Sequence, residues 1–146
     1  MNEVKTLEVV PDPVSLMESM RSVGDTAEAA VADIVDNSIS AGAANIHIQY
    51  DASGSPYVAI LDDGCGMTAV ELTGAMRHGS TNPMDQRGSG DLGRFGLGLK
   101  TASLSQARKW TVISRKGGIT SARRWDMDFV RDKGQWLVVV PEEAEL

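Results

Sequence analysis

The stretch VADIVDNSISAGAANIHI, residues 31–48, predicts a helix that ends near Ser40, a tight connection and then a strand. Apolar residues recur at helical spacing before Ser40, and apolar and polar residues alternate over 45–50. Asp33 and Asn37 lie four positions apart, so their side chains point to the same side of the helix. Such a pair can hold a magnesium ion or position a water molecule, or it can be the polar flank of an amphipathic helix.

Patterns outside this stretch complete the order of elements. Further helices are predicted at 13–23, 69–76 and 99–107. Strands are predicted at 43–51, at 57–63 (mostly buried), at 109–129 (a hairpin turning at Gly117-Gly118) and at 135–140. The residues expected to cap helix N-termini are Asp12, Asp25 and Thr68. Because helices and strands do not alternate regularly, we expect one α+β domain over residues 1–146, a two-layer sandwich.

The composition suits a single globular domain, with 146 residues of which 42% are hydrophobic. The net charge of −6 argues against direct nucleic-acid binding by this domain. The segment RKGGITSARR, residues 115–124, is either a local basic patch or a solvated hairpin with surface arginines. Cys65 is the only cysteine, so no intrachain disulfide can form, which is typical of a reducing compartment. Without a signal-peptide pattern or a membrane-spanning run, we expect a cytoplasmic location and no membrane partner.

The stretch YVAILDDGCGMT, residues 57–68, leads a strand into Gly64 and Gly66. Two glycines one residue apart let a backbone turn sharply and approach a ligand closely, although a simple strand-ending turn is the alternative. The pattern also resembles a dinucleotide-binding fingerprint, which needs an acid about 20 residues further on, at the end of a second strand. Residues 83–90 are a predicted loop, so we reject the dinucleotide interpretation.

The stretch GRFGLGLKTAS, residues 93–103, is a second glycine-rich segment and opens a predicted helix. Exposed backbone amides at a helix N-terminus bind anions, so this segment is a candidate phosphate cradle, with a flexible loop as the alternative. It is not a P-loop, because Leu99 separates Gly98 from Lys100 and no strand precedes it.

The three motifs together, DIVDNSISAGAANIHI, LDDGCGMT and GRFGLGLKTA, resemble the GHKL ATPase superfamily of gyrase, heat-shock chaperones, histidine kinases and MutL. The last motif and the preceding MRHGSTN are most similar to the branch of the MORC ATPases and their bacterial relatives. The resemblance covers residues 27–105. It implies the Bergerat ATP-binding fold, a mixed, mostly antiparallel sheet with helices on one face, and an ATP lid at 77–95.

The resemblance also implies roles for individual residues. Asp33 matches the general base that acts on the attacking water, a position usually held by glutamate, so we expect slow hydrolysis. Asn37 matches the magnesium-binding amide, and Asp62 matches the carboxylate that accepts a hydrogen bond from the adenine amino group. The other implied ATP contacts are Gly64, Gly66, Met67, Ser80, Thr81, Gly93, Phe95, Gly96, Leu97, Gly98, Leu99 and Lys100.

Two further positions carry less specific expectations. Asp36 is interpreted as a supporting or solvated residue on the same helix. Thr120 is the available candidate for the threonine that commonly supports the adenine carboxylate in the superfamily. A chain that ends before the corresponding strand would be C-terminally truncated.

The function implied is Mg²⁺-dependent ATP hydrolysis that serves as a conformational and dimerisation switch, with ATP and Mg²⁺ as cofactors. We expect ATP-dependent homodimers of the full protein. Two alternatives remain: the catalytic domain of a histidine kinase and a nucleotide-binding module that does not hydrolyse ATP.

Overall fold

The computed structural model describes residues 4–24, 26–78 and 103–146. The helices are α1 (Pro13–Ser22), α2 (Ala27–Ser40), α3 (Ala69–Met76), α5 (Met127–Lys133) and the 3-10 helix η1 (Glu143–Glu145). The strands are β1 (Ile46–Asp51), β2 (Tyr57–Asp62), β3 (Lys109–Lys116) and β4 (Ile119–Asp126). Of the helix expected at 99–107, the described part is helical at 103–106. The α+β class is therefore confirmed.

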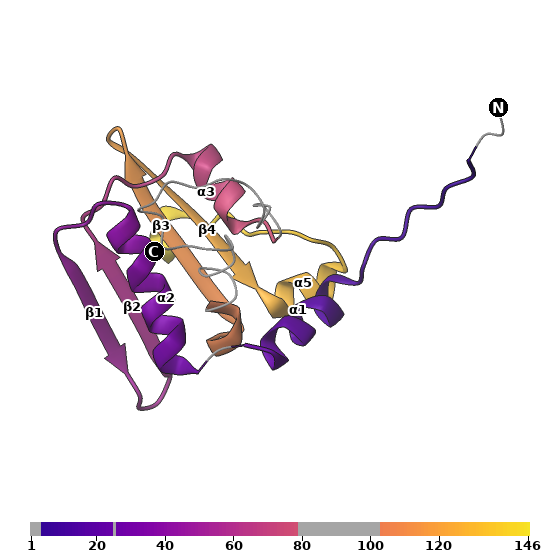
Figure 1. Ribbon diagram of the computed structural model, residues 1–146, viewed down its shortest axis with the longest axis horizontal. Helices are drawn as coiled ribbons and strands as arrows, with labels where there is room; N and C mark the ends of the chain where they lie inside the picture. Colours follow the sequence, from indigo (N-terminus) through magenta and orange to yellow (C-terminus); the bar gives the residue numbers. More distant parts are fainter. Residues whose placement is uncertain (1–3, 25, 79–102) are drawn as a thin grey trace.

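The strands form two antiparallel hairpins, β1–β2 and β3–β4 (Figure 1). This arrangement corrects the expectation of one mixed sheet, because within the described residues the two hairpins are separate two-stranded sheets. A loop after β2, and not a backbone ladder, contacts β3. The strand expected at 135–140 is also wrong, since this segment makes only an isolated antiparallel bridge between Val139 and Arg124.

Helix caps explain where the first helices begin. At α1, the Asp12 side chain accepts from the Ser15 N–H at 2.9 Å, as expected. At α2, the prediction of Asp25 is wrong: the N-cap is Thr26, whose side chain accepts from the Ala29 N–H at 3.3 Å. Asp25 itself lies outside the described residues. Both residues are good N-caps, so composition alone did not separate them.

The helix α5 replaces the end of the hairpin predicted at 109–129, because β4 stops at Asp126. The Asp126 side chain accepts from the N–H groups of Asp128 and Phe129 and so caps the new helix. Gly134 ends it in the left-handed conformation, with φ of 63°. This Asp-to-Gly spacing was a usable sequence signal for a helix of two turns.

The hydrophobic core joins α1, α3, the β3–β4 hairpin and α5. Its buried members are Met17, Leu72, Met76, Leu104, Trp110, Trp125, Met127 and Val130. The indole N–H of Trp125 donates to the Met76 carbonyl at 2.9 Å, so the end of α3 is fixed to β4.

The β1–β2 hairpin contributes little to that core, which overturns the prediction of a mostly buried strand at 57–63. Val58 and Leu61 of β2 are 58% and 68% exposed. Successive strand residues point to opposite faces, and α2 lies over one face of the hairpin (Figure 1). Val58 and Leu61 are three positions apart and so lie on opposite faces, yet both are exposed. Hydrophobicity alone predicted burial, but within the described residues α2 leaves most side chains on both faces of β2 uncovered.

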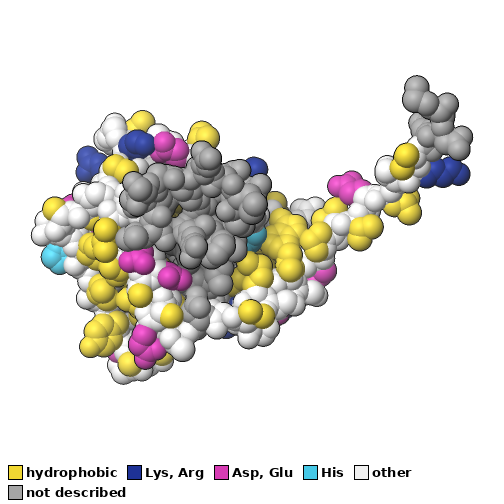
Figure 2. Space-filling model, viewed as in Figure 1, with side chains coloured by type: hydrophobic (Ala, Val, Ile, Leu, Met, Phe, Trp, Pro, Cys, Tyr) yellow, Lys and Arg dark blue, Asp and Glu magenta, His cyan; other side chains and the backbone are white. Residues whose placement is uncertain are grey.

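The N-terminal arm, residues 4–12, extends away from the domain (Figure 1). Its hydrophobic side chains Val4, Leu7, Val9 and Val10 are exposed along this arm (Figure 2). Among the described helices, none combines the length and the hydrophobicity of a membrane-spanning segment.

The basic segment at 115–124 is partly used for internal contacts. Arg124 donates to the Thr111 hydroxyl at 2.8 Å, and Arg123 donates to the Thr73 hydroxyl at 2.9 Å. Arg123 and Arg124 are half-buried, whereas residues 115–120 are exposed, so neither a basic patch nor a solvated hairpin describes the whole segment.

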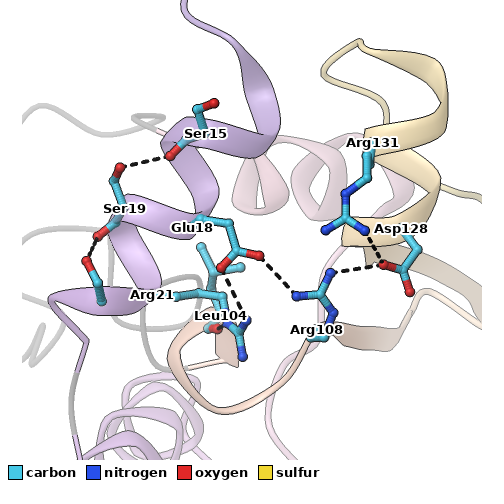
Figure 3. A network of polar contacts seen from close by, with 9 residues as sticks. Ser15, Glu18, Ser19, Arg21, Leu104, Arg108, Asp128 and Arg131 are labelled. Carbon is cyan, nitrogen blue, oxygen red and sulfur yellow. Dashed lines mark hydrogen bonds and ion pairs between the residues drawn. The ribbon is translucent and has the colours of Figure 1, made fainter.

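An ion-pair network joins α1 to α5 (Figure 3). Arg108, just before β3, contacts Glu18 Oε1 at 3.0 Å and Asp128 Oδ1 at 2.9 Å. Arg21 reaches Glu18, and Arg131 reaches Asp128, each at 3.4 Å. The side-chain hydrogen bond from Arg108 is the main reason that the pKa of Glu18 lies below its ordinary value, and burial opposes it.

The lowered pKa of Glu18 predicts an acid-sensitive contribution to stability. A carboxyl with a depressed folded-state pKa stabilises fully above its unfolded pKa and loses that contribution as pH falls through the folded value. The loss therefore begins near the ordinary glutamate value of about 4.3 and continues below it. Urea unfolding of the wild type and Glu18→Gln at neutral pH and at about pH 3 measures it. We expect a smaller pH dependence for the variant, and identical dependences would contradict this assignment.

Candidate functional site

The helix α2 places Asp33 and Asn37 one turn apart on the same side, both half-buried. The Asn37 Nδ2 atom is buried and has no hydrogen-bond partner in the part of the chain that the structure describes. An unsatisfied buried donor costs about 1–3 kcal/mol. The Nδ2 group therefore has an unused donor, which could bind an oxygen of a ligand, and a half-turn of the carboxamide would present its own oxygen instead.

Asp62, at the end of β2, is positioned by two donors. The Ser38 hydroxyl donates to Asp62 Oδ2 at 2.6 Å, and the Gly64 N–H donates to Asp62 Oδ1 at 2.9 Å. An ionised carboxylate has about four acceptor sites, so capacity for another donor remains. The Asp62 residue is exposed, which leaves the carboxylate accessible to a ligand.

Ser38 was missed by the sequence analysis. It is 3% exposed and follows Asn37 directly, so α2 and β2 meet at the Ser38–Asp62 hydrogen bond. The hydroxyl that supports Asp62 thus comes from α2. The prediction that Thr120 supports this carboxylate directly is wrong, since Thr120 lies exposed near the turn of the β3–β4 hairpin. A small polar residue within an apolar helical segment was the available signal.

Asp63 is a second residue that the sequence analysis did not single out. Its Oδ1 atom accepts from the N–H groups of Ala44 and Asn45 at 2.7 and 2.9 Å, and its Oδ2 atom accepts from Asn45 Nδ2 at 2.8 Å. The side-chain hydrogen bond from Asn45 is the main cause that lowers the pKa of Asp63. The connection between α2 and β1 is thereby fixed to the loop after β2.

Both glycines of this loop are needed because other parts of the chain approach it closely. A Cβ at Gly64 would lie 2.8 Å from the Ala41 Cβ. A Cβ at Gly66, which has φ of 68°, would lie 2.9 Å from the Arg115 carbonyl carbon and closer still to its oxygen. The structure thus gives these glycines a role in packing against the end of α2 and against β3, in addition to any approach of a ligand.

Met67 is half-buried and packs against the hydrophobic core. Its position between the glycine loop and the core is compatible with the expected place beside an adenine ring.

Asp36 is also half-buried on α2. No group of three or more His, Cys, Asp or Glu side chains that could hold a metal ion occurs at 4–24, 26–78 or 103–146.

The remaining predicted contacts lie outside the described residues. They are Ser80, Thr81, Gly93, Phe95, Gly96, Leu97, Gly98, Leu99 and Lys100. Of the lid expected at 77–95, the structure describes Arg77 and His78. The described part of the candidate site is therefore formed by α2, the end of β2 and the loop after it.

The site comprises a carboxylate with spare acceptor capacity, a carboxamide whose Nδ2 atom is buried, and a second carboxylate. Asp62 can accept from an amino group, and Asn37 can bind an oxygen or a cation. Asp33 can orient or deprotonate a water molecule. The set suits a ligand that carries an amino group at one end and anionic oxygens at the other.

Comparison with known proteins is consistent with this chemistry. The family model of histidine kinase-, DNA gyrase B- and HSP90-like ATPases matches residues 25–146. The chain is 36% identical to the DNA mismatch repair protein MutL of Halobacterium salinarum over 97 residues, which cover 64% of this chain and 15% of that protein. It is 30% identical to ATPase morc-1 of Caenorhabditis elegans over 106 residues, which cover 72% of this chain and 12% of that protein.

A third relative is the MutL of Buchnera aphidicola subsp. Acyrthosiphon pisum, 31% identical over 110 residues, which cover 74% of this chain and 19% of that protein. The chain thus spans between 12% and 19% of the length of these three curated relatives.

Proposed function

Since the chain belongs to the family of histidine kinase-, DNA gyrase B- and HSP90-like ATPases, we propose that it binds ATP with Mg²⁺ in the site between α2 and the loop after β2, and hydrolyses the nucleotide slowly. The observation that carries the proposal concerns the Asn37 Nδ2 atom, one turn from Asp33, which is buried and has no hydrogen-bond partner among the described residues. A structural polar flank would leave this side chain in water, whereas a phosphate oxygen would accept from Nδ2, or the turned carboxamide would bind a cation through its oxygen.

The adenine end of the site is assigned to Asp62. Its carboxylate accepts from the adenine amino group, while Ser38 and Gly64 hold it in place. A guanine base presents a carbonyl oxygen at the equivalent position, and two acceptors facing each other repel. This supports selection of ATP over GTP, because a site built to accept a hydrogen bond rejects a base that lacks the donor.

The phosphate end is assigned to Asn37 and Asp33. Magnesium usually keeps several waters and takes few protein ligands besides substrate phosphates, so one amide oxygen suits it. When bound, the ion would neutralise charge on the β- and γ-phosphates. Asn37 would hold the ion, and Asp33 would orient the attacking water and accept its proton.

Slow turnover follows from the length of the Asp33 side chain, which is one methylene shorter than glutamate. A general base must come within about 2.6–3.2 Å of the proton donor that it serves, so a shorter reach reduces the fraction of productive encounters. The same feature favours, as a second candidate, a module that binds ATP without hydrolysing it.

We further propose that ATP binding acts as a conformational switch and promotes dimerisation in the full protein. A ligand shifts a conformational equilibrium only by its difference in affinity for the two states, and a lid that closes over ATP would provide that difference.

The proposal is tested by ATP turnover of the wild-type chain with Mg²⁺ and with excess chelator. We expect slow, Mg²⁺-dependent release of phosphate that is lost with chelator. Phosphate release independent of Mg²⁺ would contradict the metal assignment, and binding without any release would select the non-hydrolysing module.

A further inference from the structure

The loop of residues 63–68, which joins β2 to α3, rests on one face of β3. The Met67 N–H donates to the Ser114 hydroxyl at 2.7 Å. Two residues along β3, the Lys116 ammonium contacts both carboxylate oxygens of Glu71, at 3.0 and 2.9 Å. Residues two apart in a strand point to the same face, so Ser114 and Lys116 together support the loop and the first turn of α3.

Backbone hydrogen bonds fix the loop from several sides. The N–H groups of Asp63 and Cys65 donate to the carbonyls of Asn45 and Ala41 at 3.3 and 3.0 Å. The Thr68 N–H donates to Glu71 within α3. In the described part of the chain, the acceptor that the β3–β4 hairpin supplies to a backbone N–H of this loop is the Ser114 hydroxyl.

Ser114 is well suited to hold the loop still. It lies within the eight-residue strand β3 and is half-buried, and its backbone is paired across the hairpin with Ser121. A hydroxyl on an ordered strand loses little further freedom when it accepts a hydrogen bond, so the contact costs less entropy than one made by a flexible surface side chain. The Arg115 backbone at Gly66 leaves the loop little room to shift toward the strand.

We propose that Ser114 is a positioning residue for the nucleotide site, holding residues 64–67 in the conformation that accepts the adenine, so that the β3–β4 hairpin is coupled to nucleotide occupancy. This inference rests on the proposed function. Ser114 acts through the Met67 amide and touches no nucleotide atom. Without the Ser114 hydroxyl, the Met67 N–H loses its acceptor and the loop samples conformations that do not bind ATP. The apparent affinity for ATP then falls in proportion to the fraction of chains whose loop is in the binding conformation.

The test measures ATP affinity by calorimetry in Mg²⁺ for Ser114→Thr and Ser114→Val. These side chains have nearly the same shape and both suit a strand, so they differ mainly in the hydroxyl. We expect Ser114→Thr to bind as the wild type does and Ser114→Val to bind about five- to tenfold more weakly, the effect of one neutral hydrogen bond. Ser121→Ala, which removes the hydroxyl directly across the hairpin, is the matched control and should leave the affinity unchanged.

A second measurement needs no nucleotide. Hydrogen exchange of the Met67 amide in the free chain should be faster in Ser114→Val than in Ser114→Thr, with equal melting temperatures. Equal ATP affinities of the two variants, equal exchange rates at Met67, or a comparable loss in Ser121→Ala would overturn the inference. If the wild type bound no ATP, the proposed function would fail, while the exchange rates would still decide whether Ser114 holds the loop.

Discussion

Replacing Asp33 by asparagine should lower the rate of ATP turnover by about 100-fold or more while ATP affinity stays within about twofold of the wild type. The amide has nearly the shape of the carboxylate but accepts no proton. A residue that acts on the attacking water contributes to the transition state and little to ground-state binding. The result is therefore a fall in kcat with little change in Kd.

Two further variants separate this role from a structural one. Asp36→Asn makes the same change on the same helix and should leave turnover unchanged. Asp33→Glu restores the length usual at this position and should raise turnover above the wild-type rate. Single-turnover phosphate release with separately measured affinity gives both quantities. Asp33 is not the base if Asp33→Asn hydrolyses ATP as fast as the wild type.

Replacing Asp62 by asparagine should weaken ATP binding by about 10- to 150-fold, which corresponds to the 1.5–3 kcal/mol of a hydrogen bond to a charged group. The carboxylate already accepts from Ser38 and from the Gly64 N–H. An asparagine side chain brings a donor of its own, which must face either one of these donors or the adenine amino group. At least one favourable contact is therefore replaced by a repulsive one.

Calorimetry of Asp62→Asn with ATP measures this effect, and Ser38→Ala provides a graded comparison. Ser38 only orients the carboxylate, so its loss should weaken binding by less than the loss of Asp62. Asp51→Asn is the matched control, because Asp51 bonds to Ser53 in the β1–β2 turn. An unchanged ATP affinity in Asp62→Asn would remove the adenine assignment.

Local chemistry explains which elements the sequence predicted well. Thr68 and Glu71 form the reciprocal cap at the start of α3, where an N-cap threonine stands three residues before a glutamate. The hairpin turn at Gly117-Gly118 is found with φ of 58° and 78°, values that favour glycine at both positions. Such signals depend on residues a few positions apart, so one sequence contains them in full.

The features that escaped prediction depend on contacts between distant residues. The partners of Asp62 and Asp63 are Ser38 and Asn45, which lie on other elements. Neither pairing follows from spacing, because the approach of α2 to β2 is decided by the packing of the whole domain. Exposure of β2 likewise depends on what covers each face of its sheet. The motif positions pointed to the site, while the residues that hold the motif in place became visible only in three dimensions.

The adenine and phosphate assignments are tested together by calorimetric titration of the wild-type chain with ATP and with GTP in the presence of Mg²⁺. We expect ATP to bind at one site per chain and GTP to bind at least about 100-fold more weakly, because the Asp62 carboxylate finds a donor on adenine and an acceptor on guanine. Equal affinity for the two nucleotides, or no heat of binding with ATP, would contradict these assignments.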